Sequence, residues 1–229
     1  METKHRVFNL IILDESGSME PIKDTIISGF NEVVQTVKGV AQKFPDQEHF
    51  ISLVTFNGLG IKTLLDNENV AKLDMIDGAK YHTDASTPLF DAMGKGIGQL
   101  RRVTNTHSNY NVLVTILTDG EENASVEYSG QAIKKMVEEL KLQRWTFTYI
   151  GANHDVESFA ASISIHNTMQ FEASETDTKR MFDREKKARM RFSSDMRSGM
   201  DVSVESYKYY EEEPPASDSE MPPTTEEQS

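Results

Sequence analysis

The chain has 229 residues, a formal net charge of −13 at pH 7 and no cysteine. This length is enough for one domain with a large core, with or without a tail. The lack of cysteine excludes disulfides and thiolate metal sites, and it fits a reducing compartment. The acidic charge argues against a nucleic-acid partner, because phosphate contacts need clustered Lys and Arg.

The N-terminal residues lack the pattern of a signal peptide. Their apolar run, 7–13, is interrupted by Asn9, ends at Asp14 and has no small-residue cleavage site after it. No window of the sequence approaches the length of a membrane span. We therefore expect a soluble, cytoplasmic protein without a membrane partner.

Strand-like segments recur along the first 172 residues. Strands are expected at 7–13, 50–56, 61–65, 112–118, 146–150 and 168–171. The runs "VFNLIIL", "ISLVTF" and "VLVTILT" are almost continuously apolar or β-branched, which is typical of strands that are covered on both faces. The segment "NGLG" between 50–56 and 61–65 is typical of an antiparallel hairpin.

Helical periodicity separates most of these strands. It covers 21–44, 88–104, 129–143 and, in a shorter segment, 155–163. Alternation of strands and helices predicts an α/β fold with a doubly wound, mainly parallel central sheet and helices on both faces. The hairpin adds one antiparallel edge strand, so the expected fold is Rossmann-like.

The composition changes after residue 172. We expect an α/β domain over 1–172, a charged helical extension over 173–200 and an acidic disordered tail over 201–229. The tail contains nine acidic residues and one lysine, together with prolines and serines, a composition that does not support a packed core.

Oxygen-rich side chains occupy three loops at expected strand or helix ends. Asp14, Ser16 and Ser18 follow the first strand, Thr87 precedes Pro88 in "TDASTPLFDA", and Asp119 precedes Gly120 in "ILTDGEEN". Loops that leave the carboxyl ends of neighbouring strands meet at the ligand crevice of such a sheet. Two carboxylates and three hydroxyls favour Mg²⁺ or Mn²⁺ over Ca²⁺, and leave room for one ligand from outside.

At these separations, the five residues resemble the metal-ion-dependent adhesion site (MIDAS) of the von Willebrand factor A (VWA) domain, and the resemblance spans about residues 5–172. It implies that Ser16 and Ser18 bind the metal directly and that Thr87 binds it directly or through water. It also implies that Asp14 and Asp119 hold metal-bound waters and orient the hydroxyls. The open position would take an Asp or Glu carboxylate from a partner protein.

The intracellular bacterial members of that family work beside AAA+ ATPases or in stress-response modules with kinases and phosphatases. The resemblance therefore implies a stand-alone protein-binding module of that kind and no enzymatic activity. Glu15, between Asp14 and Ser16, has no role implied by the family pattern.

Simpler interpretations exist for each loop. Ser18 can cap a helix that begins near Pro21, Thr87 can be an N-cap, and Asp119-Gly120 can be a turn. Glu121 and Glu122 can form an acidic rim or act as charges at a helix start. The remaining rim candidates are assigned by default to a structural or surface role: Asn153, His154, Asp155, Tyr81, His82 and Asp84.

Two other functions compete with the binding module. The first is an Mg²⁺-dependent phosphotransfer or hydrolase enzyme that uses the strand-end aspartates, but the chain has Ser16 where haloacid-dehalogenase-like phosphatases place a second aspartate. It also lacks a Gly-x-Ser-x-Gly elbow and a P-loop. The second is a self-assembling scaffold in which acidic tail residues, such as those at 211–213, occupy the metal site.

Overall fold

One sheet organises the described part of the chain, which comprises residues 4–73, 75 and 81–210 of this computed structural model. Its six strands lie in the order β3-β2-β1-β4-β5-β6. β3 is antiparallel to β2, and the other neighbouring pairs are parallel. The predicted doubly wound sheet with an antiparallel edge strand is confirmed. The strands are β1 (His5–Asp14), β2 (Gln47–Asn57), β3 (Gly60–Asn69), β4 (Tyr110–Thr118), β5 (Trp145–Gly151) and β6 (Asn167–Gln170).

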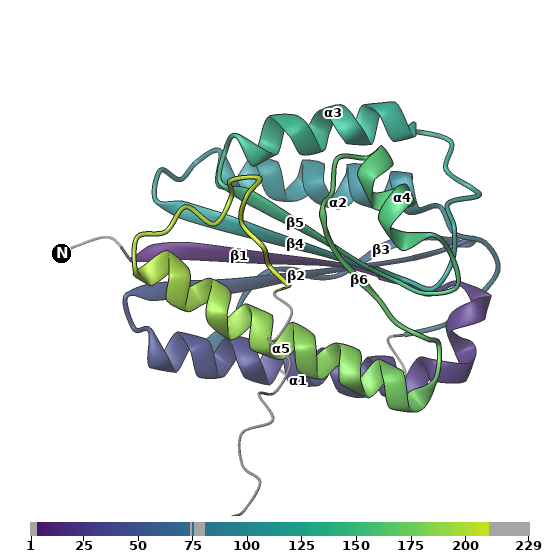
Figure 1. Ribbon diagram of the computed structural model, residues 1–229, viewed down its shortest axis with the longest axis horizontal. Coiled ribbons are helices and arrows are strands. Elements are labelled where there is room, and N and C mark those ends of the chain that lie inside the picture. Colours follow the sequence, from purple (N-terminus) through teal and green to yellow (C-terminus); the bar gives the residue numbers. More distant parts are fainter. Residues whose placement is uncertain (1–3, 74, 76–80, 211–229) are drawn as a thin grey trace, which may run out of the picture.

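Helices cover both faces of this sheet, as predicted. In Figure 1, α2, α3 and α4 lie on one side, and α1 and α5 lie on the other. The longer helices are α1 (Lys23–Lys43), α2 (Leu89–Thr104), α3 (Gly130–Lys141), α4 (Val156–Ser162) and α5 (Glu175–Arg197), and the short 3₁₀ helices are η1 (Gly17–Ile22) and η2 (Val70–Lys72). Within the described ranges, none of the helices has the length and apolarity to cross a membrane.

β1 shows why the central strands read as unbroken apolar runs. Phe8, Leu10 and Ile12 pack into the core beneath α2 and α3, whereas Ile11 and Leu13 pack into the core beneath α1 and α5. Successive side chains of a strand point to opposite faces, so a strand that is covered on both faces needs an apolar side chain at nearly every position.

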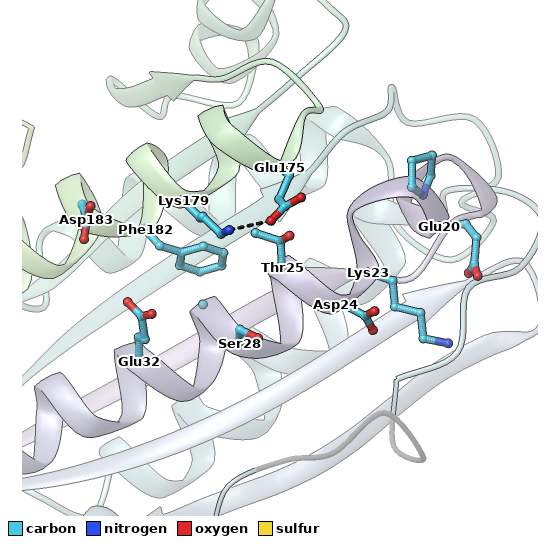
Figure 2. Close-up of a pocket in the computed structure, with 12 residues that line it drawn as sticks. Glu20, Lys23, Asp24, Thr25, Ser28, Glu32, Glu175, Lys179, Phe182 and Asp183 are labelled. Atoms are coloured by element: carbon cyan, nitrogen blue, oxygen red, sulfur yellow. Dashed lines mark hydrogen bonds and ion pairs between the residues drawn. The ribbon is translucent and has the colours of Figure 1, made fainter.

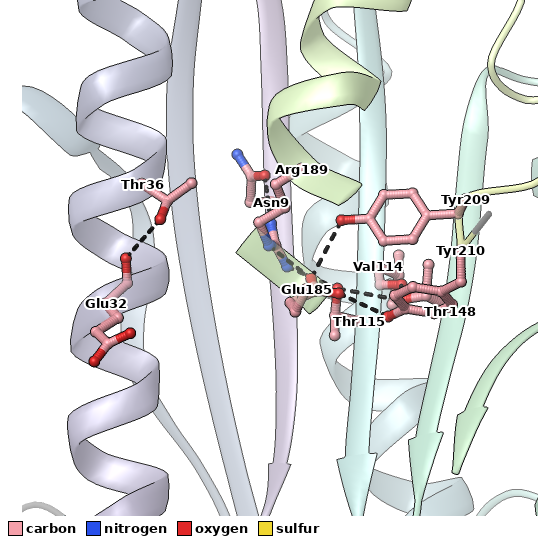
Figure 3. Close-up of polar contacts among 10 residues, drawn as sticks. All are labelled: Asn9, Glu32, Thr36, Val114, Thr115, Thr148, Glu185, Arg189, Tyr209 and Tyr210. Carbon is pink, nitrogen blue, oxygen red and sulfur yellow. Dashed lines mark hydrogen bonds and ion pairs between the residues drawn. The ribbon is translucent and has the colours of Figure 1, made fainter. Parts of the chain in front are cut away.

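Helix α5 packs beside α1 against the sheet and buries an ion pair there. Arg189 is 3% exposed, and its Nε lies 2.7 Å from Glu185 Oε1. Its Nη1 donates to Asn9 Oδ1 on β1 at 2.9 Å, and its Nη2 donates to Thr115 Oγ1 on β4 at 2.7 Å (Figure 3). These bonds fix the helix to the middle of two central strands.

Residues 201–210 also pack on this face, although the sequence places them in the disordered tail. The Tyr209 hydroxyl donates to Glu185 Oε1 at 3.2 Å, and the Tyr210 hydroxyl donates to Glu185 Oε2 at 2.7 Å (Figure 3). The buried Val202 and Tyr209 join a small core with Phe192. The tyrosines remain ordered because they supply hydrogen bonds that a buried carboxylate requires. The rest of the predicted tail, 211–229, lies outside the described residues.

Candidate metal centre

Two neighbouring parallel strands bring the predicted carboxylates to one edge of the sheet. β1 pairs with β4 in a register that sets Leu13 opposite Leu117, so Asp14 and Asp119 follow at the same edge. Between them, Thr118 Oγ1 donates to Asp14 Oδ2 at 2.6 Å. Asp14 is fully buried, and Asp119 is 2% exposed.

The two serine hydroxyls connect these carboxylates. The Ser16 backbone N–H donates to Asp14 Oδ1 at 2.6 Å, which holds the loop after β1 in a tight turn. Ser16 Oγ and Ser18 Oγ are 3.1 Å apart, and Ser18 Oγ donates to Asp119 Oδ1 at 2.6 Å. Four of the five predicted residues therefore form one continuous hydrogen-bonded set.

The fifth residue, Thr87, faces the same set from the loop before α2. A Cβ atom placed on Gly120 would lie 3.4 Å from Thr87 Oγ1 and 3.9 Å from Ser18 Oγ, so both hydroxyls face the backbone just after Asp119. Asn123 holds Thr87 in place: its Oδ1 accepts from the Thr87 N–H at 2.9 Å, and its N–H donates to the Thr87 carbonyl at 3.2 Å.

The interpretation of these hydroxyls as helix caps is wrong for this structure. Ser18 lies inside η1, and Ile22, the N-cap of α1, makes no side-chain cap. α2 has Pro88 at its N-cap and likewise no side-chain cap, so the Thr87 hydroxyl does not cap it. The Ser18 hydroxyl instead donates to Asp119, and the Thr87 hydroxyl faces the backbone of Gly120.

The donor set suits a small divalent cation. Asp119 Oδ2 is buried without a hydrogen-bond partner, although buried carboxylate oxygens are normally satisfied. Over residues 4–73, 75 and 81–210, no group of three or more His, Asp or Glu side chains is arranged to hold a metal ion. An ion at this edge would therefore depend on the hydroxyls as well as the carboxylates, and Mg²⁺ and Mn²⁺ accept such hard oxygen ligands.

Electrostatics at the site also favour a cation. Burial raises the pKa of Asp14 to about 6, against the opposing hydrogen bonds from Thr118 and Ser16. Burial likewise raises the pKa of Asp119 above its ordinary value. Two carboxyl groups that are held in a desolvated place resist ionisation, and a bound cation would reverse that resistance.

Tyr81 and Glu15 support the site in ways that their sequence positions did not indicate. Tyr81 is fully buried, not part of a surface loop, and its hydroxyl donates to the Asp14 carbonyl. Glu15 is also buried: its Oε1 accepts from the His82 N–H at 3.1 Å, and Lys62 Nζ lies 3.9 Å from its Oε2. Burial raises the pKa of Glu15. For Glu15 the one sequence signal was its adjacency to Asp14, and for Tyr81, 67 residues away, there was none.

The loop after β4 is fastened to the start of α2. Glu122 Oε2 accepts from the Phe90 N–H at 2.8 Å, and the Asp91 carboxylate accepts from the N–H groups of 126–128. Glu122 is therefore a helix-start charge, but it serves α2, which precedes it in the chain. These contacts keep Thr87 and Asp119 in a fixed relation.

The rim residues after β5 have structural partners. His154 Nδ1 lies 2.6 Å from the Ala152 carbonyl oxygen, and its Nε2 lies 3.1 Å from the Tyr149 hydroxyl. Asp155 caps α4 by accepting from the Ser158 N–H at 3.1 Å. His154 and Asp155 therefore position the β5–α4 connection, in agreement with the structural role assigned to them by default.

A separate acidic groove lies beside the centre, between the first turns of α1 and α5 (Figure 2). Its volume is about 590 Å³. Glu20, two residues after Ser18, stands at its near end, and Glu175 pairs with Lys179 at its far side. The five predicted site residues do not line this groove.

The sheet order and the helices on both faces define a doubly wound α/β protein, with the oxygen-rich cluster at the carboxyl edge of its central strands. The von Willebrand factor type A domain family matches residues 10–185, and the chain belongs to this family. Such domains are commonly protein-interaction modules. A comparison with curated protein sequences gives no match.

Solved structures of low sequence identity share the fold. Two structures of proximal thread matrix protein 1 from the mussel byssus match with TM-scores of 0.52 and 0.51 at 15% and 13% identity, covering 82% and 81% of this chain. The chain spans 47% and 46% of those mussel chains, a little under half of their length. The VWA domain of SpRpn10 matches at 10% identity with a TM-score of 0.49, covering 78% of this chain and 94% of that one.

Proposed function

We propose that the chain is a divalent-cation-dependent protein-binding module whose metal site is the strand-end cluster. The hydroxyls of Ser16, Ser18 and Thr87 would hold Mg²⁺ or Mn²⁺, with Ca²⁺ as a weaker alternative. The carboxylates of Asp14 and Asp119 would orient those hydroxyls and the ion's waters. When bound, the ion supplies a positive charge and a coordination position that is open to a partner.

The observation that carries this proposal is the buried, unpartnered Asp119 Oδ2 beside the Ser18 hydroxyl. Leaving a buried carboxylate oxygen unsatisfied costs about 1–3 kcal/mol or more, so it needs a compensating role. The hydroxyls of Ser16 and Ser18 beside this carboxylate add neutral oxygen ligands, and a hard divalent cation binds to such a set of oxygens.

The partner would be a protein that presents an Asp or Glu carboxylate to the ion. The loops at 84–87 and 119–128, which frame the site, would supply the specific contacts. The family resemblance points to AAA+ ATPases or kinase and phosphatase modules of the bacterial cytoplasm as the partner class. We favour binding over catalysis because both ring nitrogens of His154, on the same rim, are engaged and it is not placed as a base.

Isothermal titration calorimetry on the metal-stripped full chain tests the proposal. Mg²⁺ or Mn²⁺ should bind at one saturable site in the wild type, because the hydroxyl–carboxylate set is preassembled. Binding should be lost in Asp14→Ala and in the Ser16→Ala/Ser18→Ala double variant. Asp24→Ala, which removes a carboxylate from the acidic groove instead, should bind as the wild type does.

Two outcomes would overturn the proposal. If the wild-type protein bound none of Mg²⁺, Mn²⁺ and Ca²⁺, the cluster would be a set of hydrogen bonds only. Binding that persists in Asp14→Ala but disappears in Asp24→Ala would move the site to the groove.

A further inference from the structure

Helix α5 carries a row of basic side chains on its outer surface, which we call the basic stripe. Its members are spaced by four, three and four residues, the spacing that places side chains on one face of a helix. The opposite face buries Met181, Glu185 and Phe192 against the sheet. The basic stripe consists of Arg180, Arg184, Lys187 and Arg191.

The arrangement of the basic stripe points to an anionic occupant. Arg180–Arg184 and Lys187–Arg191 are like-charge pairs at i,i+4, a spacing at which like charges repel and weaken a helix. The first three residues of the stripe are exposed, so their charges are not needed for the packing of α5 against the sheet. Residues 175–197 hold eight Lys or Arg and five Asp or Glu, so α5 is basic on a chain with net charge −13, although Arg180 also lies 3.9 Å from Asp177.

The C-terminal segment is fixed to α5 beside the basic stripe. Arg191 Nη2 donates to the carbonyl oxygens of Lys208 and Tyr209, the second at 2.8 Å. The Tyr210 hydroxyl donates to Glu185 Oε2 at 2.7 Å. The described chain therefore ends against the helix that carries the stripe, and the sequence continues from there with three glutamates, 211–213.

The composition of the remaining residues complements the stripe. Residues 211–229 contain seven acidic residues and neither Lys nor Arg. The stripe covers eleven residues of rise, about 16 Å at about 1.5 Å per residue. A 19-residue segment reaches about 60 Å when extended, so it easily covers that length. Because the segment is tethered beside the stripe, its effective concentration there is high.

We propose that residues 211–229 bind the basic stripe of their own chain and shield it from other polyanions. The contact is an electrostatic surface contact in which carboxylates lie along the outer face of α5. It also draws the tail away from the metal centre, in contrast to a scaffold in which the tail occupies that centre. An acidic partner protein would have to displace the tail before it could use α5.

Site-directed spin labelling of the full chain tests this contact, because the chain has no native cysteine. A nitroxide on Ser217→Cys should broaden the amide NMR signals of α5 around 180–191. The broadening should be lost at about 1 M salt, where the screening length falls to about 3 Å. It should also be lost in Arg184→Glu/Lys187→Glu. A matched charge reversal on the other helical layer, Lys134→Glu/Lys135→Glu, should leave it unchanged.

The salt titration needs no substitution in α5. It therefore still tests the proposal if Arg184→Glu/Lys187→Glu fails to fold. Broadening centred on the amides of Ser16, Ser18 and Thr87 would overturn the proposal and place the tail at the metal centre. Broadening absent from every amide of α5 would overturn it as well. A third contradiction would be broadening that appears only between labelled and unlabelled chains in a mixed sample, since that contact is not made within one chain.

Discussion

At the scale of the residue, some side chains of the candidate metal centre could be located from the sequence and others could not. Asp14, Ser16 and Ser18 lie within one short loop, and Thr87 and Asp119 stand next to a proline and a glycine at recognisable element starts and ends. Tyr81 reaches Asp14 across 67 residues, a contact that only the folded chain creates. Short-range motifs were therefore predictable, and their long-range supports were not.

Asp14 also predicts a pH dependence of stability in the metal-free protein. Its pKa is raised from 3.8 to about 6 by burial, so the folded state keeps this proton over a range in which the unfolded state releases it. Stability is therefore lost as the pH rises from about 4 to about 6, by up to about 3 kcal/mol. Asp14→Asn, which cannot ionise, should be more stable than the wild type at pH 7 by a similar amount.

Urea unfolding in the presence of a chelator, at a series of pH values, measures this difference. The advantage of Asp14→Asn should shrink as the pH falls through 4 and vanish near about pH 3, where both states of the wild type hold the proton. His49, whose pKa is lowered to about 4 by burial, titrates over the same range with the opposite sign. It is present in both proteins and cancels in the comparison. A difference that is constant from pH 4 to pH 7 would contradict the assigned pKa of Asp14.

At the scale of the element, sequence periodicity located the strands and helices but not all of their ends. β2 begins at Gln47, three residues before the predicted start, since Gln47 and His49 are polar yet buried. His49 Nε2 lies 3.1 Å from Gln47 Oε1, and Gln47 Nε2 donates to the Ser193 carbonyl on α5. Strands are recognised in a sequence by their apolar residues, so a strand end with buried polar residues is missed.

The contact between α1 and α5 gives a sharp test at this scale. A Cβ atom on Gly29 would lie 2.0 Å from Phe182 Cδ2, so an alanine there would have to displace the Phe182 ring. Overpacking of this kind costs about 1–3 kcal/mol. It should outweigh the gain of about 1 kcal/mol in helix propensity, so Gly29→Ala should lower the free energy of unfolding.

Gly39→Ala is the matched control in the same helix. A Cβ atom there meets nothing within 4 Å, so the alanine should raise the free energy of unfolding by up to about 1 kcal/mol. Thermal or urea unfolding of the two variants measures both signs. If Gly29→Ala were as stabilising as Gly39→Ala, the close packing of Phe182 on α1 would be wrong.

At the scale of the whole molecule, the layered α/β architecture followed from the order of strands and helices along the chain. The packing of α5 against the sheet could not be predicted in this way, because the apolar positions of α5 are sparse. It depends on the buried pair of Arg189 and Glu185, with Asn9 and Thr115 from two strands far away in sequence. The domain limit at residue 172 stays a prediction, although the family match continues to residue 185 within α5.

The most direct test of the central claim is diffraction from crystals of the full chain grown with Mn²⁺, measured at the manganese absorption edge. We expect an anomalous peak in contact with the hydroxyls of Ser16 and Ser18, with Asp14 and Asp119 around it. A peak in the acidic groove beside Asp24, with none at the strand-end cluster, would contradict the proposed metal centre. So would crystals that bind no manganese at either place.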